Sequence, residues 1–436
     1  MAREDNLKVG DLSRPLDAAS PALPRAAVYG RPGVRQMFTS LQNRNYRWLW
    51  AGTVMSFIAM QMQMVARGYL VYEMTGSAKA LGMVTMAAGL PMVLVSLFGG
   101  VAADRMEKRN LLMAAQAAIG LEILGLAILI ATGYVQLWHL MVGSLIGGIA
   151  QSFNMPARQA LVPELVGEEH LMNAVALNSA GMNLTRVASP AIAGALIGPI
   201  GVSGVYFVMV AFFFITVLTL LMLPKIGVSP SYQKRAVLSE LADGLRYARQ
   251  HPVIKGLLIL ELAFVPMAMQ LQLLLPVFAL KVFDIGASGL GLLWTFVGIG
   301  GLAGSLGVAW LGNFRRKGVL LLSSGTVWGG MMVIFALFSF QGIVPAALAF
   351  LLLVGLANMS FSATNNTILM SNADPEKRGR VMSMYMAGFG FQPLLAVPSG
   401  AIADAVGAPA TILVVGALMC AAVLFVGATR VAIRNA

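Results

Sequence analysis

The stretch ALGMVTMAAGLPMVLVSLFGGVAA, residues 80–103, contains 24 consecutive residues without a charged side chain. A second such run, VYFVMVAFFFITVLTLLML, occupies residues 205–223. A helix needs about 20 predominantly apolar residues to cross a hydrocarbon core of about 30 Å. Both stretches are therefore predicted to be transmembrane helices, with the lipid bilayer as their solvent.

The rest of the chain has the same character. Of 436 residues, 58% are hydrophobic and only 11% are charged. Soluble domains contain roughly 45–50% apolar and about 25% charged residues, so this chain has too few charges to cover a water-facing surface. Its single cysteine, Cys420, lies in an apolar run, which excludes a disulfide framework or a thiolate metal site.

Apolar segments recur along the chain and predict an all-α membrane protein with twelve transmembrane helices. Residues 1–45 are polar and rich in proline, and we expect a flexible cytoplasmic tail without a signal peptide. The polar linker 224–253 separates two six-helix halves, 46–223 and 254–436, and its segment Ser239–Arg249 can form an amphipathic surface helix. The predicted spans lie near 46–72, 78–102, 110–132, 136–156, 172–198, 204–223, 254–280, 288–311, 318–339, 344–366, 381–403 and 410–429.

The basic residues predict the orientation. Nearly all of the 30 lysines and arginines, Arg158 included, fall on the tail, the linker and the loops or span ends that share one side with both termini. Basic loops face the cytoplasm, so both termini are predicted to be cytoplasmic in a cell membrane. The net charge of +12 then reflects loops that face anionic lipid, and a nucleic-acid partner is not expected. The exceptions are Lys79, Lys281, Arg67 and Arg186.

The two halves repeat each other at an offset near 208 residues. The matches occur in loops and in helices alike, which chance matches between apolar segments do not explain. The matched pairs are Ser152 with Ser360, Phe153 with Phe361, Glu168 with Glu376, Pro190 with Pro398, and Lys108 with Arg316. Two parallel six-helix halves joined by one linker resemble the arrangement of major-facilitator transporters, whose substrate site lies near the midplane between the halves.

Residues 100–109, GVAADRMEKR, resemble the signature loop that follows the second helix of the major facilitator superfamily. Glu107 departs from the glycine that is usual there. An ordinary basic cytoplasmic loop is the alternative interpretation. The resemblance implies that the Asp104 carboxylate can accept hydrogen bonds at the N-terminus of a neighbouring helix. It also implies that the basic residues anchor the loop at the cytoplasmic face. The loop then supplies the conformational-gate candidates Gly100, Asp104, Arg105, Lys108 and Arg109.

Two further segments resemble the enterobactin-exporter-like, or transmembrane secretion effector, branch of that superfamily. They are residues 156–166, PARQALVPELV, and residues 375–383, PEKRGRVMS. The fifth span also keeps part of an antiporter glycine-proline motif, which favours export. The branch resemblance covers roughly residues 37–430, and these segments add the gate candidates Pro190, Gly194, Arg378 and Arg380.

Four charged residues fall inside predicted spans, where each charge costs about 2.5–3.5 kcal/mol on insertion scales and so requires a reason. Since cavity-lining helices in this superfamily include the seventh, Glu261 is the first proton-coupling candidate, and a structural partner for Arg67 is the alternative. Glu122, the second candidate, falls on an outer helix, where a buried pair is the competing interpretation. Arg186 suits either an anionic substrate or a structural carboxylate. Arg67 can line the cavity or extend to the membrane surface.

Uncharged polar residues supply the remaining cavity candidates. Two glutamines separated by one residue point about 200° apart around a helix, so in each repeated pair one can contact substrate while the other bridges helices. The pairs are Gln61 with Gln63 and Gln270 with Gln272. The other candidates are Gln151, Asn154, Asn358, Asn365 and Asn366.

The sequence as a whole predicts a secondary active transporter, working by alternating access as a proton-coupled exporter of small amphipathic molecules such as drugs or siderophores. Uptake of a small solute on the same fold is the alternative. His139, His170 and His251 lack the spacing of metal ligands and no phosphate-binding loop is found, so neither an enzyme, a metal site, a cofactor nor direct ATP drive is expected. The predicted partners are a small-molecule substrate, protons and the lipid bilayer, for a monomeric chain.

Overall fold

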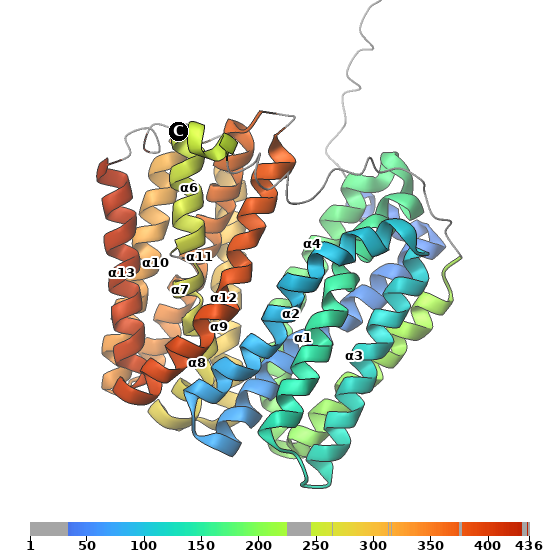
Figure 1. Ribbon diagram of the computed structural model, residues 1–436, viewed down its shortest axis with the longest axis horizontal. Helices are drawn as coiled ribbons and strands as arrows, with labels where there is room; N and C mark the ends of the chain where they lie inside the picture. Colours follow the sequence, from blue (N-terminus) through green and yellow to red (C-terminus); the bar gives the residue numbers. More distant parts are fainter. Residues whose placement is uncertain are drawn as a thin grey trace, which may run out of the picture.

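In the computed structural model, the chain forms two helical bundles that lie side by side (Figure 1). The structure describes residues 34–224, 246–263, 265–312, 314, 316–374, 377–429 and 434, and the side chains of 34–37, 96–105, 263, 383 and 386–389 fall outside this description. Most of the predicted tail, most of the linker and most of the predicted surface helix Ser239–Arg249 therefore lie outside the described residues. No strand occurs among the residues that are described.

The N-terminal half begins with a short 3-10 helix and continues with long α-helices. Helix α1 starts where the Asn43 side chain accepts hydrogen bonds from the backbone N–H groups of Asn45 and Tyr46, satisfying donors that a helix start leaves unpaired. It ends at Gly76, whose φ of 61° suits glycine. The elements are η1 (Val34–Gln42), α1 (Arg44–Thr75), α2 (Ala78–Arg105), α3 (Lys108–Ala131) and α4 (Leu137–Leu221).

Helix α4 is 85 residues long and turns twice. A straight helix of that length would measure roughly 130 Å, several times the thickness of a bilayer. Gly167 and Gly201 break it, because their φ values of 70° and 71° are positive and their ψ values are extended. The three helical segments on either side of these glycines correspond to the predicted fourth, fifth and sixth spans.

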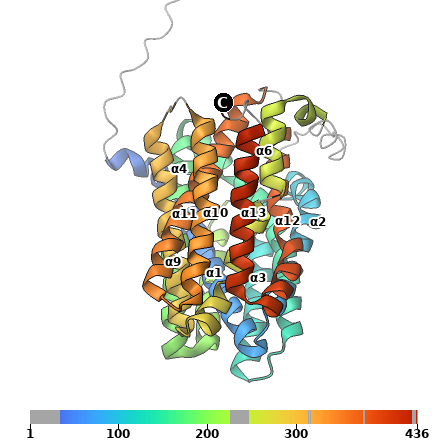
Figure 2. The ribbon, with the colours of Figure 1, turned by 90° about the vertical axis from the view of Figure 1, so that its left-hand side faces the viewer.

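The C-terminal half contains a broken first helix followed by continuous ones. Helices α10 and α13 run side by side in it (Figure 2), and a Cβ atom on Gly329 would lie 2.7 Å from the carbonyl oxygen of Gly416. The elements are α6 (Pro252–Ala263), α7 (Val265–Ala268), α8 (Gln270–Val277), the π-helix η2 (Phe278–Val282), α9 (Gly286–Leu311), α10 (Lys317–Phe340), α11 (Val344–Asn372), α12 (Arg378–Val406) and α13 (Ala408–Thr429).

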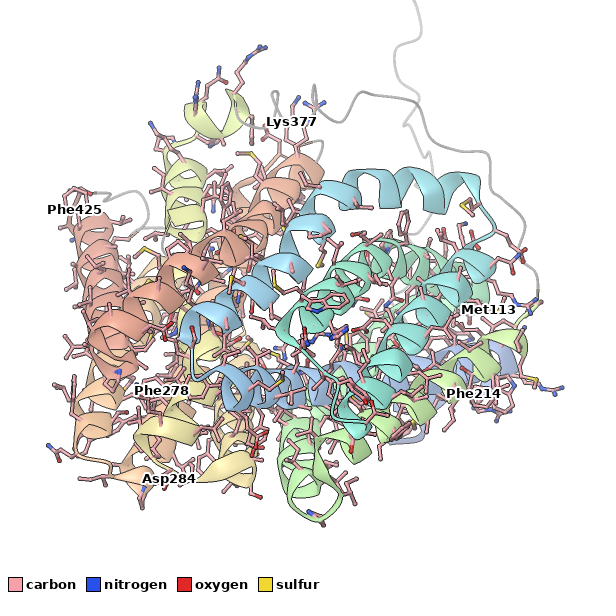
Figure 3. The ribbon with its side chains drawn as sticks, turned by 60° about the horizontal axis from the view of Figure 1, so that its bottom comes forward. Met113, Phe214, Phe278, Asp284, Lys377 and Phe425 are labelled. Carbon is pink, nitrogen blue, oxygen red and sulfur yellow. The ribbon has the colours of Figure 1, made fainter. Side chains whose placement is uncertain are left out.

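The outer surface of the bundles is apolar. Leu121, Phe214 and Phe425 are 68%, 63% and 67% exposed, and Figure 3 shows the two phenylalanines at the periphery. Water would not favour such a surface, whereas lipid chains cover it readily. Nine helices in the described part of the chain are long and apolar enough to cross a membrane. The protein is therefore a multi-pass membrane protein; the number twelve, which needs three spans in α4 and one in α12, stays a prediction.

Two seams of small residues join the halves. On the α2–α12 seam, a Cβ atom on Gly82 would lie 2.4 Å from the carbonyl oxygen of Ala396. On the α4–α9 seam, a Cβ atom on Gly194 would lie 2.6 Å from the carbonyl oxygen of Ala287. Figure 1 shows the bundles meeting away from the C-terminus and diverging toward it. Close backbone packing therefore holds the halves together at one end.

Candidate functional site

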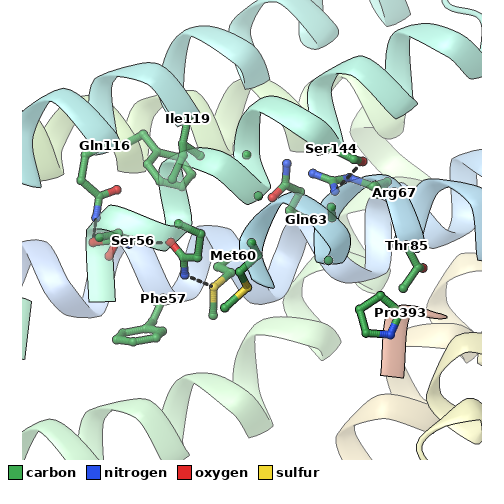
Figure 4. A pocket seen from close by; sticks show the side chains of 18 of the residues that line it. Ser56, Phe57, Met60, Gln63, Arg67, Thr85, Gln116, Ile119, Ser144 and Pro393 are labelled. Atoms are coloured by element: carbon green, nitrogen blue, oxygen red, sulfur yellow. Dashed lines mark hydrogen bonds between the residues drawn. The ribbon is translucent and has the colours of Figure 1, made fainter. Parts of the chain in front are cut away.

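A cavity of about 270 Å³ lies in the N-terminal half beside the α2–α12 seam. Four helices of that half form most of its wall, and Gln392 and Pro393 of α12 complete it from the other half. Figure 4 shows Arg67 and Ser144 at one end, Gln116 and Ser56 at the other, and Gln63 between them. The cavity therefore combines polar groups at both ends with contributions from both halves, as a transport site between two moving bodies requires.

Arg67 and Glu122 form the charged cluster at one end of this cavity. Arg67 Nη2 lies 4.0 Å from Glu122 Oε1. Arg67 Nη1 also donates a hydrogen bond to Ser144 Oγ at 2.9 Å, and Gln63 Nε2 donates to Glu122 Oε2 at 3.5 Å. The structure thus places Arg67 on the cavity and not at the membrane surface, and it pairs this arginine with Glu122 and not with Glu261. Of the two neighbouring glutamines, Gln63 lines the cavity, and Gln61 is not among the lining residues.

An amide network forms the other end. Asn154 Nδ2 donates to Gln151 Oε1 at 2.7 Å, and Gln116 Nε2 donates to Asn154 Oδ1 at 3.2 Å. Arg158 Nη2 donates to Asn154 Oδ1 at 3.3 Å and to Ser56 Oγ at 3.1 Å. Arg158 was grouped with the basic residues of cytoplasmic loops and span ends, and the structure buries it within α4, where it lines the cavity. Pro156, two residues earlier, is accommodated inside the same helix.

Glu261 is buried separately, in the C-terminal half. Asn365 Nδ2 of α11 donates to its Oε2 at 2.8 Å, and no arginine or lysine in the described residues forms an ion pair with it. A hydroxyl pair, Ser362 and Tyr385, lies on the adjoining helices α11 and α12 with its oxygens 2.9 Å apart. Glu261 therefore has an amide donor where Glu122 has an arginine.

The two glutamines of the second pair lie in different surroundings. Gln270 is buried, and its Nε2 donates to the carbonyl oxygens of Pro266 at 2.8 Å and of Gln392 at 3.4 Å, which bridges α8 and α12. Gln272 and Asn358 instead line a small gap in the C-terminal half. The described contacts therefore give Gln270 a helix-bridging position.

Arg186 lies apart from both clusters. It is exposed, and its Nη1 lies 3.7 Å from the sulfur of Met359 on α11 in the other half. It is not among the residues that line the cavity, and no described carboxylate pairs with it. The structure therefore brings Arg186 to the contact between the halves.

The gate candidates are distributed over several contacts. The contacts of Gly100 and the side chains of Asp104 and Arg105 lie outside the described part of the structure. Lys108, which is buried, forms an ion pair with Glu164, and Arg109 donates to the carbonyl oxygens of Leu220 and Leu221 at 3.0 and 3.1 Å. These two basic residues thus tie α3 to α4.

The remaining gate candidates lie elsewhere. The carbonyl oxygen of Pro190 and the Cα atom of Gly194 face Gly291 across the α4–α9 seam. Arg378 Nε donates to the carbonyl oxygen of Ala373 at 3.3 Å, and Arg380 is half-buried in the first turn of α12. The proline and glycine therefore belong to the contact between the halves.

One contact between the halves was not predicted from the sequence, and it lies on the α2–α12 seam. Asp404, at the end of α12, accepts hydrogen bonds at its two carboxylate oxygens from the Ala78 N–H and the Ser77 hydroxyl, both at 2.7 Å, and from the Lys79 N–H at 3.0 Å. The carboxylate thereby caps the N-terminus of α2 across the seam. The signal in the sequence was a single acidic residue, Asp404, next to the end of a predicted span that carries no basic residues.

The described residues contain no set of metal ligands, since no group of three or more His, Cys, Asp or Glu side chains gathers there. The polar groups that do gather, two guanidinium groups, a carboxylate and several amides, suit hydrogen bonding to a small polar or charged molecule. The geometry therefore favours a binding cavity.

Comparisons with known proteins agree with this geometry. The model of the transmembrane secretion effector family matches residues 35–436. The chain is 28% identical over 342 residues to an enterobactin exporter, EntS, of Salmonella choleraesuis, covering 78% of this chain and 81% of that one. It is 27% identical over 365 residues to a multidrug efflux pump, Tap, of Mycolicibacterium fortuitum, covering 80% and 87%.

Solved structures with the same fold are more distant in sequence. The nucleoside transporter NupG superposes with a TM-score of 0.69 at 14% identity, over 88% of this chain and 98% of that one. A D-xylose-proton symporter superposes with a TM-score of 0.68 at 13% identity, over 89% and 97%. At these identities the likeness concerns the fold alone. Together with the family match, it identifies the chain as a member of the transmembrane secretion effector family with the major-facilitator fold.

Proposed function

We propose that this protein is a secondary active exporter of small amphipathic molecules that works by alternating access. The observation that carries the proposal is the polar cavity beside the seam, walled by both halves and adjoined by close backbone packing at one end. The relatives named as an enterobactin exporter and a multidrug efflux pump support the direction. In this mechanism the halves rock about the cavity and expose it to each side of the membrane in turn.

Proton coupling is the second part of the proposal, with Glu261 as the coupling group. A carboxyl group that is buried without a cation is favoured in its neutral form, so it can take up a proton from one side and release it when hydrated from the other. Asn365 can donate a hydrogen bond to either form. Glu122 is the second candidate, but Arg67 offsets its charge and makes proton binding less favourable.

The topology completes the proposal. We place the protein in the cytoplasmic membrane as a monomer with twelve spans and both termini in the cytoplasm, divided into halves 46–223 and 254–436 by the linker 224–253. The concentration of basic residues on one side supports this orientation. With it, the α2–α12 and α4–α9 seams close the outer side and the structure is inward-facing. The proposal assigns transport, and no enzymatic reaction, to the chain.

A transport screen tests this proposal. Inverted membrane vesicles with and without the protein are energised and given a panel of labelled anionic, neutral and cationic amphipathic solutes, with and without a proton uncoupler. We expect at least one solute to accumulate only with the protein and only without the uncoupler. Protein-dependent movement out of the vesicles instead would favour the uptake alternative. Solute accumulation that the uncoupler does not reduce would contradict proton coupling.

A further inference from the structure

We infer that the cavity binds a substrate carrying one oxyanion group, such as a carboxylate, and that Arg158 is the residue that holds it. The inference rests on the proposed transport function and adds the substrate's charge to it. Its basis is a buried guanidinium group that lines the cavity with most of its donors unused.

Arg158 has more donors than partners. The residue is 7% exposed, and only its Nη2 makes hydrogen bonds, to Ser56 and Asn154; Nε and Nη1 are buried without a partner. A guanidinium group has five N–H donors in a fixed fork, which matches the two oxygens of a carboxylate. The Phe57 ring covers one face at 5.4 Å and leaves the edge for hydrogen bonding. Three of the five N–H donors, one on Nε and two on Nη1, are therefore left for hydrogen bonds to an oxyanion.

Of the two arginines that line the cavity, Arg158 is the one whose charge no described carboxylate balances. Arg67 at the far end has Glu122 at 4.0 Å, whereas no described carboxylate forms an ion pair with Arg158. Among the described residues, those that line the cavity include two arginines and no aspartate or glutamate. A buried, unpaired charge is costly. The cavity thus has a net positive charge, which an anionic substrate neutralises and a cationic one does not.

The length and the apolar lining of the cavity indicate what the rest of the substrate is. Ser56, beside Arg158, and Arg67 are eleven positions apart on α1, which corresponds to about 16 Å along the helix. The lining between the two ends includes Met60, Ile119 and Phe213. An apolar body can lie there while its oxyanion contacts Arg158. The chemistry therefore fits an amphipathic monoanion.

Calorimetric binding to the purified full-length chain in lipid nanodiscs tests this inference with charge-matched probes. The probes are 1-naphthoate with 1-naphthamide and 4-phenylbutyrate with 4-phenylbutyramide, with 1-naphthylmethylammonium as the cation. We expect at least one carboxylate to bind at least tenfold more tightly than its amide. Arg158→Gln should then weaken the carboxylate at least tenfold and the amide less than twofold, and Arg158→Lys should restore part of the loss.

Controls separate a binding effect from a folding effect. Lys255→Gln removes one positive charge from an exposed position in α6, away from the cavity, and should leave both affinities unchanged. If Arg158→Gln does not fold, the wild-type comparison of acid with amide and the Arg158→Lys variant still decide. Equal binding of acid and amide, tighter binding of the cation, no carboxylate binding at all, or a folded Arg158→Gln with unchanged affinity would each overturn the inference.

The binding test is independent of the export test. It uses no proton gradient, so a carboxylate that binds through Arg158 supports the oxyanion site even if energised vesicles show no accumulation. Conversely, driven accumulation of a cation that does not depend on Arg158 would support export and overturn the oxyanion site.

Discussion

The two halves of the molecule each bury a glutamate, and they surround it differently. In the N-terminal half, Glu122 has Arg67 at 4.0 Å and receives a hydrogen bond from Gln63. In the C-terminal half, Glu261 receives a hydrogen bond from Asn365 and has no ion pair in the described residues. An arginine stabilises a carboxylate in its charged form, whereas a neutral amide can serve both forms.

This difference separates two tasks. A proton taken up by Glu122 would leave the half-buried Arg67 with an unbalanced charge, so the N-terminal cluster is suited to hold a fixed charge pattern beside the cavity. A proton taken up by Glu261 leaves no opposite charge unpaired. We infer that the N-terminal half supplies binding and the C-terminal half supplies coupling, and the variants below are chosen to break that division.

The largest expected effect on stability is on the paired glutamate. Glu122→Gln leaves Arg67 without its carboxylate, and removing one member of a fully buried ion pair costs about 3–5 kcal/mol; the Arg67 side chain is 17% exposed, which lowers the cost. Because Ser144 still accepts from Arg67, we expect the lower end of that range. Glu261→Gln is the matched control, since it removes no partner of a cation, and should cost less than about 1 kcal/mol. Denaturant unfolding of the purified variants measures both.

A double variant sharpens this comparison. Arg67→Gln combined with Glu122→Gln removes both charges, so it should be more stable than either single variant. If Glu122→Gln and Glu261→Gln lose the same stability, or the double variant shows no recovery, the two glutamates do not differ as described.

The second effect concerns the seam that joins the halves. A Cβ atom on Gly194 would lie 2.6 Å from the carbonyl oxygen of Ala287, so Gly194→Val should force α4 away from α9 at a cost of about 1–3 kcal/mol. Gly198→Val is the matched control, because nothing lies within 4 Å of its Cβ position. Thermal unfolding midpoints compare the two. Equal midpoints would mean that the close approach at Gly194 does not stabilise this conformation.

The smallest effect concerns the carboxylate that caps α2 across the seam. Asp404→Asn keeps one acceptor oxygen but loses the charge and the second acceptor, which should cost about 1 kcal/mol. Asp284→Asn changes an exposed aspartate in the same way and should have no effect. The readout is again the unfolding midpoint, here at low salt, where charge effects are largest. A loss as large for Asp284→Asn would exclude a specific cap at Asp404.

Much of the fold could be predicted from the sequence, because the bilayer imposes long apolar segments that are visible without neighbours. The predicted spans 46–72 and 318–339 lie within α1 (Arg44–Thr75) and α10 (Lys317–Phe340). The breaks at Gly167 and Gly201 within α4 also follow from residues that tolerate positive φ.

The candidate site was less predictable, because contacts between helices are set by rotation and depth, which apolar composition does not encode. The pairing of Arg67 with Glu122 joins residues 55 positions apart on α1 and α3. Arg158 was grouped with the basic residues of loops and span ends because of its charge, and its burial follows only from the packing of α4 on α1. Asp404 acquires its role from a helix start that lies in the other half.

The division of tasks is tested most directly by pH-gradient-driven transport in inverted vesicles with wild type, Glu261→Gln and Glu122→Gln, using a solute that the wild type accumulates. If Glu261 couples transport to protons, Glu261→Gln still binds the solute and exchanges it across the membrane without a gradient, but loses at least tenfold of the driven accumulation. Glu122→Gln, where folded, keeps a response to the gradient. Undiminished driven accumulation by Glu261→Gln would contradict the account.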